Sequence, residues 1–495
     1  MHSACESQLL WMVMEKGADP PRASRYAWRE VDLASQPKRA AEARITDFHE
    51  IYSLFDEETI REQAARCVQC AHPACVEGCP LGNRIPEWIG LAAEGKFLEA
   101  ARISRQTSSM PEICPRVCPQ ERLCEGSCVV HSREGLEPVC IGAIEKFINE
   151  YALAHGGGEI FTAAPNGKRV AVVGSGPGGM ACADRLSQLG HAVTVFESEA
   201  HAGGLLLFGI PAFKLEKEIV ERRVNILRRQ GVEFRTGVTV GRDITLAQLR
   251  AEFDAVFLGI GALKPKPAGV PGSELKGVLQ GLPFLAQKNA PISLGMPPVE
   301  VKGKRVVVLG GGDSAMDCLR TAIRCGAAET VCVYRRDLAN MPGSRKEYAN
   351  ALEEGARFMF LTNPVALEGN ADGEVTTVHC VRMELGEPDA SGRRSPKKVA
   401  GSEFTLEADL VLIAYGFDPV PFPPESDLSQ IEVNSWGATK VDENQRTNIP
   451  GVFAGGDVVR GPSLVVHAVR DGRKAAEAIH RYLEAGTNAS PHGEG

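Results

Sequence analysis

Apolar positions recur at two different periods along the chain, and the change of period divides it into two parts. Between residues 47 and 151 they recur at helical spacing, with proline, glycine and cysteine in the loops between. This pattern predicts a small α-helical N-terminal domain, with helices over Glu57–Cys67, Ile85–Glu94, Phe97–Gln106 and Ile141–Leu153. Residues 1–40 show no clear pattern and are interpreted as an arm.

From Lys168 onward, short β-branched runs alternate with helical stretches. A strand over Arg169–Val173 precedes a glycine turn, a helix to about residue 190 and a second strand over Ala192–Phe196, which is a βαβ unit. The same order returns with strands over Arg305–Leu309 and Thr330–Tyr334. The repeat predicts an α/β fold class with two Rossmann-like domains behind the helical domain.

Composition narrows the class of protein. The chain has 495 residues, 43% of them hydrophobic and 24% charged, with a formal net charge of −8. This length suggests about three domains at about 150 residues each. The acidic balance argues against a nucleic-acid partner, and no apolar run approaches the roughly 20 residues that cross a bilayer. Without a signal-peptide pattern either, we expect a cytoplasmic protein with no membrane contact.

The first glycine loop matches the dinucleotide-binding pattern G-x-G-x-x-G directly after a strand. In this pattern the first glycine allows a tight turn, the second lets the backbone approach a pyrophosphate, and the third lets helix and strand pack closely. Glu197 ends the next strand, where its carboxylate can accept hydrogen bonds from a ribose. The candidate residues of this loop are Gly174, Ser175, Gly176, Pro177 and Gly179.

The second loop is a G-x-G-x-x-A variant, and its following strand ends differently. Tyr334 is followed by Arg335 and Arg336, where a site for NAD would carry an acid. Guanidinium groups bind a 2′-phosphate that a carboxylate would repel, so this site is predicted to bind NADPH. The loop residues assigned to it are Gly310, Gly312, Asp313, Ser314 and Ala315.

A third element lies near the C-terminus, where a short apolar strand ends in Gly455-Gly456-Asp457. It resembles the second FAD motif of two-dinucleotide flavoproteins, in which the aspartate contacts the ribityl and pyrophosphate region. A helix that starts near Leu464 would aim its positive N-terminus at the flavin ring. This resemblance makes the first glycine loop the FAD site.

The order of these motifs implies that the NADPH-binding domain is inserted into the FAD-binding domain. Gly261 lies where the outgoing linking strand would be, and Tyr415 and Gly416 lie on the returning one, beside the NADPH site. The expected limits are residues 1–165 for the arm and helical domain, 166–290 plus 405–495 for the FAD-binding domain, and 291–404 for the NADPH-binding domain.

Eight of the 15 cysteines lie in two tight groups between residues 67 and 128. Clustered cysteines in a cytosolic protein indicate metal or redox chemistry. The Cys-Pro junctions at 79–80 and 118–119 are typical of ferredoxin-like iron–sulfur runs. Two other interpretations remain open: a zinc-binding interaction module, and a disulfide enzyme similar to thioredoxin reductase that uses Cys67 and Cys70.

Several motifs together resemble one family over nearly the whole chain from about residue 47. The family is that of the small (β) subunit of NADPH-dependent glutamate synthase, which includes the N-terminal half of dihydropyrimidine dehydrogenase and the large subunit of ferredoxin–NADP transhydrogenases. The motifs that carry the resemblance are the segments 66–70, 78–81, 118–128, 203–206, 208–211, 310–317, 340–344 and 455–457.

The resemblance implies two [4Fe-4S] clusters with interleaved ligands. Cys67, Cys70, Cys75 and Cys128 would hold one cluster, and Cys79, Cys118 and Cys124 would hold the other together with a non-cysteine ligand. Glu145 aligns with that fourth position. Cys114 is the alternative to Glu145, and Cys140 is a third contender because it lies nearby in the sequence.

The resemblance also implies a flavin-enclosing loop with Gly204, Leu205, Ile210 and Lys214. No general acid–base set stands out, so Lys214 is the one possible catalytic residue. The implied function is electron transfer from NADPH through FAD and the clusters to a partner in a hetero-oligomer. That partner would be the large (α) glutamate synthase subunit, which makes two glutamates from glutamine and 2-oxoglutarate. A transhydrogenase or a dihydropyrimidine dehydrogenase is the alternative.

Overall fold

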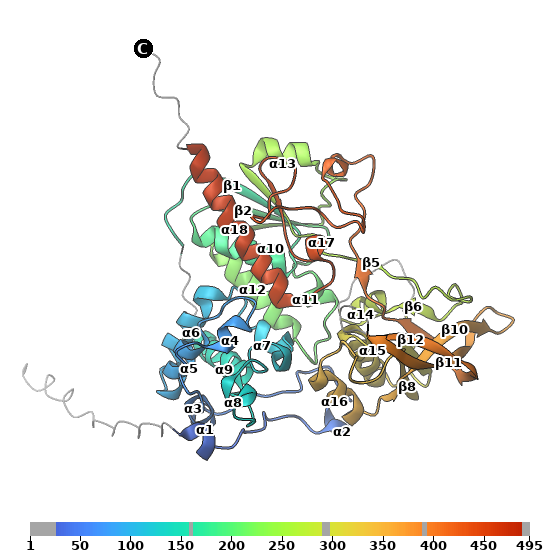
Figure 1. The fold of residues 1–495 in the computed structure, drawn as a ribbon. Helices are drawn as coiled ribbons and strands as arrows, with labels where there is room; N and C mark the ends of the chain where they lie inside the picture. The colour runs from blue at the N-terminus through green and yellow to red at the C-terminus, as the bar shows by residue number, and fades with distance from the viewer. Residues whose placement is uncertain (1–25, 158–161, 290–297, 389–393, 488–495) are drawn as a thin grey trace, which may run out of the picture.

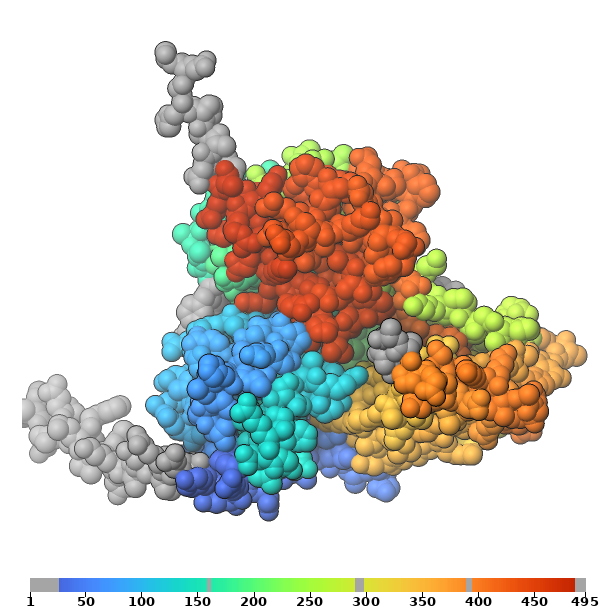
Figure 2. All heavy atoms as spheres, viewed as in Figure 1, coloured from blue at the N-terminus to red at the C-terminus, as the bar shows by residue number. Residues whose placement is uncertain are grey.

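The computed structural model describes residues 26–157, 162–289, 298–388 and 394–487. Three parts lie against one another: a helical domain drawn in blue to cyan, a first Rossmann-like domain above it, and a second one to its right (Figure 1). Figure 2 shows that side chains of the helical domain reach both of the other parts. None of the described helices is both long and apolar enough to span a bilayer.

The helical domain forms as its apolar periodicity predicts, and its four main helices end within two residues of the expected limits. Trp88, Ile89, Ile144 and Ile148 fill its core. Asp56 caps one helix by accepting a hydrogen bond from the backbone N–H of Thr59. The helices of this domain are α1 Ala27–Glu30, α2 Ala41–Arg44, α3 Glu57–Ala65, α4 Ala74–Glu77, α5 Ile85–Ala93, α6 Phe97–Thr107, α7 Cys114–Val117, η1 Gln120–Arg122, α8 Val129–Ser132 and α9 Ile141–Ala154.

The first Rossmann-like domain is built on a parallel five-stranded sheet in the order β15-β4-β1-β2-β3. Its central strands are buried on both faces, which explains their continuous apolar sequence. The strands are β1 Arg169–Val173, β2 Ala192–Glu197, β3 Glu233–Thr236, β4 Ala255–Leu258 and β15 Val452–Ala454. Its helices are α10 Pro177–Gln188, α11 Leu205–Phe208, α12 Lys217–Arg229, α13 Leu246–Glu252, η2 Asp427–Gln430, α17 Asp457–Arg460 and α18 Val465–Thr487.

The second domain repeats this plan with a parallel sheet in the order β6-β13-β7-β8-β9, beside an antiparallel sheet β10-β11-β12. The parallel strands are β6 Val278–Gln280, β7 Arg305–Leu309, β8 Glu329–Val333, β9 Arg357–Met359 and β13 Leu410–Ile413. The antiparallel strands are β10 Thr362–Gly369, β11 Val375–Pro388 and β12 Arg394–Glu407, and the helices are α14 Gly281–Asn289, α15 Asp313–Arg324 and α16 Arg345–Glu353.

The chain passes between the two sheets through a pair of short antiparallel strands, β5 Lys264–Pro265 and β14 Phe417–Asp418. Gly261 and Gly416 precede them with φ of 75° and 87°, angles that favour glycine. Because β6 and β13 both pair within the second sheet, the chain changes sheet before residue 290 and returns after residue 405. The expected limits of the inserted domain are therefore too narrow.

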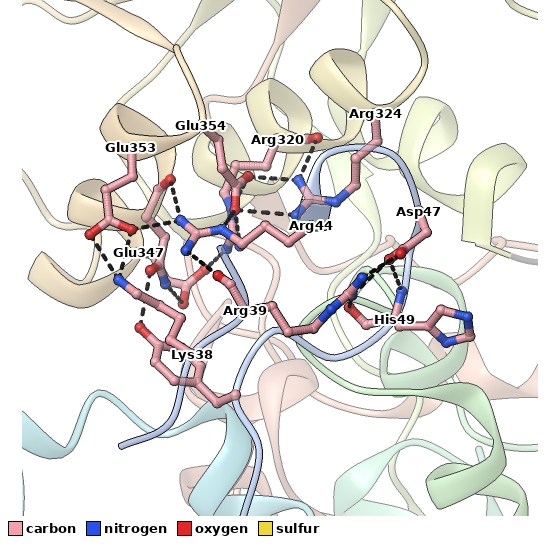
Figure 3. A network of polar contacts seen from close by, with 12 residues as sticks. Lys38, Arg39, Arg44, Asp47, His49, Arg320, Arg324, Glu347, Glu353 and Glu354 are labelled. Carbon is pink, nitrogen blue, oxygen red and sulfur yellow. Dashed lines mark hydrogen bonds and ion pairs between the residues drawn. The ribbon is translucent and has the colours of Figure 1, made fainter. Parts of the chain in front are cut away.

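Helix α2 and the segment that follows it reach the second Rossmann-like domain and dock on helix α16, as Figure 3 shows. The Arg44 side chain is 1% exposed; it donates to Glu354 at 2.8 Å and to Glu353 at 2.8 Å. Tyr52 donates its hydroxyl to Asn350 Oδ1 at 3.0 Å. Residues just after the part of the sequence that shows no pattern thus form a polar clamp between domains.

Replacing Arg44 by methionine should lower the free energy of unfolding by about 2 kcal/mol. Removal of one buried partner costs more in general, but Glu354 keeps two other arginines. Lys38→Met is the matched control, because the Lys38–Glu353 pair is partly exposed and should contribute less than about 1 kcal/mol. Urea unfolding measures both variants, and equal losses would contradict the assignment of Arg44 as the clamp.

Candidate functional site

The first set of cysteines surrounds a pocket inside the helical domain. Cys67, Cys70, Cys75 and Cys128 line it together with apolar side chains from α5 and α9. Burial raises the pKa of Cys67 to about 11 and that of Cys75 to about 12, and the neighbouring thiols of the set add to the shift. A thiolate is disfavoured here unless a cation compensates its charge, which suits a metal centre.

The second set brings five candidate ligands together. Cys118 lies in hydrogen-bond contact with Cys114, and it is close to Cys124 and Glu145 as well. Cys79 lies near both Glu145 and Cys114. Burial raises the pKa of Cys124 well above its ordinary value. Cys114 and Glu145 both lie near the other cysteines of this set, so both remain candidates for the fourth ligand.

Glu145 is held so that one of its oxygens is already engaged. Asn83 donates to Oε1 at 2.9 Å and Ser104 donates to the same oxygen at 3.2 Å, whereas Oε2 takes part in neither bond. Burial raises the pKa of this carboxyl to about 7, and the two hydrogen bonds oppose that shift. Sequence reasoning missed Asn83 and Ser104, because nothing in the local pattern marks them as partners of a residue on α9.

Cys140, the third contender, points elsewhere: its sulfur lies 3.8 Å from Gln63 Oε1. Cys182 and Cys318 are fully buried in helices, as small hydrophobic residues are. Within the described ranges, no three His, Cys, Asp or Glu side chains converge closely enough to hold a single metal ion.

The first glycine loop runs from β1 into α10 and is tightly packed. Gly174 has φ of 95°, and a Cβ at Gly179 would lie 1.9 Å from the carbonyl oxygen of Gly174. Glu197, at the end of β2, accepts hydrogen bonds from the backbone N–H and the hydroxyl of Ser175. Its other oxygen accepts from the Ser198 hydroxyl and the backbone N–H of Glu199, so the predicted acid braces the loop with both oxygens.

Asp457 closes the opposite side of this loop, since β15 and β1 flank the same strand, β4. Its Oδ1 atom is buried without a hydrogen-bond partner, and burial raises the pKa of its carboxyl to about 7. Buried polar atoms without partners are rare in native proteins, and this one lies in the motif that the sequence assigns to the flavin. Helix α18 begins just after Leu464 and lies alongside α10 (Figure 1). This arrangement fits FAD.

The segment Gly203–Ile210 folds back over the first glycine loop. Gly203 donates its N–H to Ser175 Oγ at 2.9 Å, and a Cβ at Gly204 would lie 2.7 Å from the Cα of Gly176. Leu205 begins α11, and Lys217 donates from Nζ to the carbonyl oxygens of Leu206 and Ile210 behind it. We refer to residues 203–217 as the flavin loop.

The second glycine loop has the same construction. Gly310 has φ of 142°, and a Cβ there would lie 2.4 Å from the carbonyl oxygen of Ala414. Ala315 is fully buried, as a residue in the third glycine position should be. Asp313 accepts a hydrogen bond from the backbone N–H of Ser344 at 2.8 Å, which holds segment 340–344 beside the loop. Ser314 follows in the first turn of α15.

The two arginines proposed for the 2′-phosphate differ in their surroundings. Arg335 is exposed and lies near Tyr415. Burial raises the pKa of the Tyr415 hydroxyl to about 12, and the positive charge of Arg335 opposes part of that shift. Arg336 donates Nε to the carbonyl oxygen of Arg394 at 3.1 Å. The structure thus brings Arg335 and Tyr415 together at the edge of the second sheet and ties Arg336 to the antiparallel sheet.

The second cysteine set lies between the first set and the flavin loop. Cys114 and Cys118 share an apolar cluster with Leu207 and Ile210 of the flavin loop and with Leu464. Cys79 and Cys124 pack instead in the core of the helical domain, together with Cys67, Cys75 and Cys128 of the first set. Glu121, between Cys118 and Cys124, accepts a hydrogen bond from the Ser344 hydroxyl at 2.9 Å and so reaches the second glycine loop.

Comparison with family models assigns residues 168–472 to the family described as "Pyridine nucleotide-disulphide oxidoreductase". Residues 44–157 match a model described as dihydropyrimidine dehydrogenase domain II, 4Fe-4S cluster. The first model covers more than half of the chain, and together the two models span both parts that the sequence pattern separates.

Among curated proteins, the chain is 45% identical to the glutamate synthase [NADPH] small chain of Escherichia coli over 93% of this chain and 99% of that one. It is 46% identical to the putative oxidoreductase AegA of the same organism, over 90% of this chain and 69% of that one. FprA of Mycobacterium tuberculosis in complex with NADPH is a solved structure of similar fold, with 22% identity, a TM-score of 0.56, and coverage of 65% of this chain and 86% of that one.

Gly176 and Gly312 are the positions that probe the two nucleotide sites most cleanly. Each has backbone angles open to any residue, and a Cβ on either would meet no atom within 4 Å. The chain itself therefore does not need glycine there, whereas an approaching pyrophosphate does.

We expect Gly176→Ala to fold normally and to lose FAD, and Gly312→Ala to keep FAD and bind NADPH more weakly. A lost hydrogen bond to a phosphate is worth about 1.5–3 kcal/mol, or roughly 10- to 100-fold in affinity. Flavin absorbance per chain and NADPH titration measure the two effects, and each variant serves as the control for the other. Full FAD content in folded Gly176→Ala would contradict this assignment.

Proposed function

The chain belongs to the glutamate synthase [NADPH] small-chain family, and we propose that it supplies electrons from NADPH to a large glutamate synthase subunit. It is an oxidoreductase of the NADPH, FAD and iron–sulfur type. In the proposed complex, the large subunit converts glutamine and 2-oxoglutarate to two glutamates. The observation that carries the proposal is that Cys114 and Cys118 of the second cysteine set pack in one apolar cluster with the flavin loop.

Each part of the chain has a separate task in this proposal. Gly176, Glu197 and Asp457 would hold FAD, and Gly312 and Arg335 would hold NADPH. Bound flavin accepts two electrons together and releases them singly, which is the conversion that NADPH and iron–sulfur clusters require of each other. The protein binds and orients these groups and excludes water between them.

Two clusters are proposed, one for each cysteine set. The second set would lie on the flavin side, because Cys114 and Cys118 pack in the same apolar cluster as the flavin loop. The first set would face the partner, because Cys70 is partly exposed and the residues next to it, Gln69 and Ala71, are exposed. We therefore propose that the electron acceptor docks over Cys70.

The alternative is another electron acceptor for the same module, as in a ferredoxin–NADP transhydrogenase or a dihydropyrimidine dehydrogenase. The 46% identity to a putative oxidoreductase that is longer than this chain keeps this alternative open. The disulfide-enzyme interpretation is less consistent with the geometry, since Cys67 and Cys70 line the first pocket inside the helical domain and not the flavin loop.

Reconstitution tests the partner. We expect the anaerobically purified chain to contain FAD and iron, and NADPH to bleach its flavin more readily than NADH does. Mixing with the large subunit should then yield glutamate from glutamine and 2-oxoglutarate at the expense of NADPH. If NADPH is oxidised only when ferredoxin or a pyrimidine-reducing partner is added, the large glutamate synthase subunit is not the acceptor.

The fourth ligand of the second set can be decided by two variants. We expect Glu145→Ala to lose one cluster, so that iron falls from about eight to about four atoms per chain. Cys114→Ser should keep the full iron content, because Cys114 would serve only as a hydrogen-bonding neighbour of Cys118. Iron analysis and EPR spectroscopy measure both variants, and the reverse result would make Cys114 the ligand.

A further inference from the structure

Lys214 lies at the end of the flavin loop, in a tight turn. Pro211 accepts backbone hydrogen bonds from the N–H groups of Lys214 and Leu215 at 3.0 and 3.1 Å. The lysine side chain extends from this turn to the other Rossmann-like domain. Any movement of the flavin loop moves this side chain as well.

The ammonium group of Lys214 makes its polar contacts with the other Rossmann-like domain. Its Nζ lies 3.0 Å from Asp317 Oδ1 on α15 and 3.7 Å from Glu347 Oε2 on α16. The side chains of the lysine and the aspartate are 11% and 8% exposed. Burial alone would lower the pKa of Lys214, but the two carboxylates raise it above its ordinary value. The lysine is therefore charged and paired across the domain boundary.

Asp317 connects this contact to the NADPH site. It lies one helical turn after Asp313, the first residue of α15, which follows the open position at Gly312. Because Asp313 also holds Ser344 beside the glycine loop, the start of α15 is fixed to that loop. A bond to Asp317 thus fixes the helix on whose N-terminus the dinucleotide would rest.

The side chains around the Lys214–Asp317 pair are closely packed. The Phe213 ring is fully buried beneath the guanidinium groups of Arg320 and Arg324, 4.4 and 4.0 Å from its centroid. Both arginines bind Glu354, which also receives Arg44, as Figure 3 shows. A second tie runs in parallel, since Asn289 donates to the carbonyl oxygen of Phe208 at 2.9 Å.

We propose that Lys214 is a positioning residue for hydride transfer, which sets the NADPH-binding helix α15 at a fixed place relative to the flavin loop through its ion pair with Asp317. It acts across the domain boundary and does not stabilise charge on the flavin. The inference rests on the proposed flavin and NADPH sites. Reacting atoms must be placed to within about 1 Å, so a loosened helix costs rate even when both nucleotides stay bound.

The test compares Lys214→Met, Lys214→Arg, Asp317→Asn and the double variant Lys214→Met/Asp317→Asn, all loaded with FAD. The double variant matters because it leaves no unpaired partner of this pair in the interior. Lys440→Met is the matched control, since Lys440 forms an exposed pair with Glu432 at 3.5 Å on the surface. Flavin content and circular dichroism confirm that each variant is folded.

Anaerobic rapid mixing with NADPH should separate rate from binding. We expect Lys214→Met to reduce flavin at least about tenfold more slowly at saturating NADPH, with an unchanged dissociation constant for NADPH. The double variant should be no slower than the slower single variant, because the two residues act as one unit. Lys214→Arg should restore most of the rate, and Lys440→Met should match the wild type.

Two further readouts do not depend on turnover. The flavin midpoint potential should be the same in the wild type and in Lys214→Met, whereas a lysine that acts on the flavin would shift it. In the wild type, NADP⁺ binding should slow hydrogen–deuterium exchange in residues 203–217, and the double variant should lose this response. A shifted potential, an unchanged rate or a retained exchange response would each overturn the proposal.

The wild-type measurement distinguishes failure of this inference from failure of the proposed function. If NADPH does not reduce the flavin of the wild type, the proposed nucleotide sites are wrong. If the wild type is reduced and the variants are reduced equally fast, the sites stand and only the role of Lys214 is wrong.

Discussion

The carboxylate of Glu354 is the point on which three guanidinium groups from two parts of the chain converge. Arg320 and Arg324 reach it from α15, and Arg44 reaches it from α2 of the helical domain. Burial alone would raise the pKa of Glu354, but the arginines lower it to about 2. A buried charge is tolerated only when an opposite charge is buried beside it. The segments that carry Arg44, Arg320, Arg324 and Glu354 must therefore pack against one another together.

The flavin loop joins this junction through Phe213 and Lys214, and the helical domain joins it through Arg44 and Glu121. All three domains are therefore tied to the helices around the second nucleotide site. A protein that moves electrons between several bound groups depends on their fixed separation. The junction supplies that constraint with buried ion pairs and one aromatic ring.

Several features of the chain are unfavourable until a ligand is present. Asp457 Oδ1 is buried without a partner, and the cysteine thiols sit where burial opposes their ionisation. Gly176 and Gly312 are glycines although the folded chain has room for a methyl group there, and glycine loses more conformational entropy on folding than alanine does. Proteins accept such local costs at functional sites, and each of these features lies where the corresponding cofactor is expected.

The sequence by itself determined the helices, the two βαβ units and both glycine loops, because periodicity and glycine spacing are local properties of the chain. It did not determine where the chain changes sheet, since a run as short as Val278–Gln280 fits either sheet until its neighbours are known. Nor did it determine the partner of Lys214, which lies 103 residues away. Only tertiary structure decided these points, because pairing across domains depends on which side chains folding buries together. The tertiary structure also brings Cys114 and Glu145 to one site, whereas their spacing in the sequence could not decide which of them is the fourth ligand.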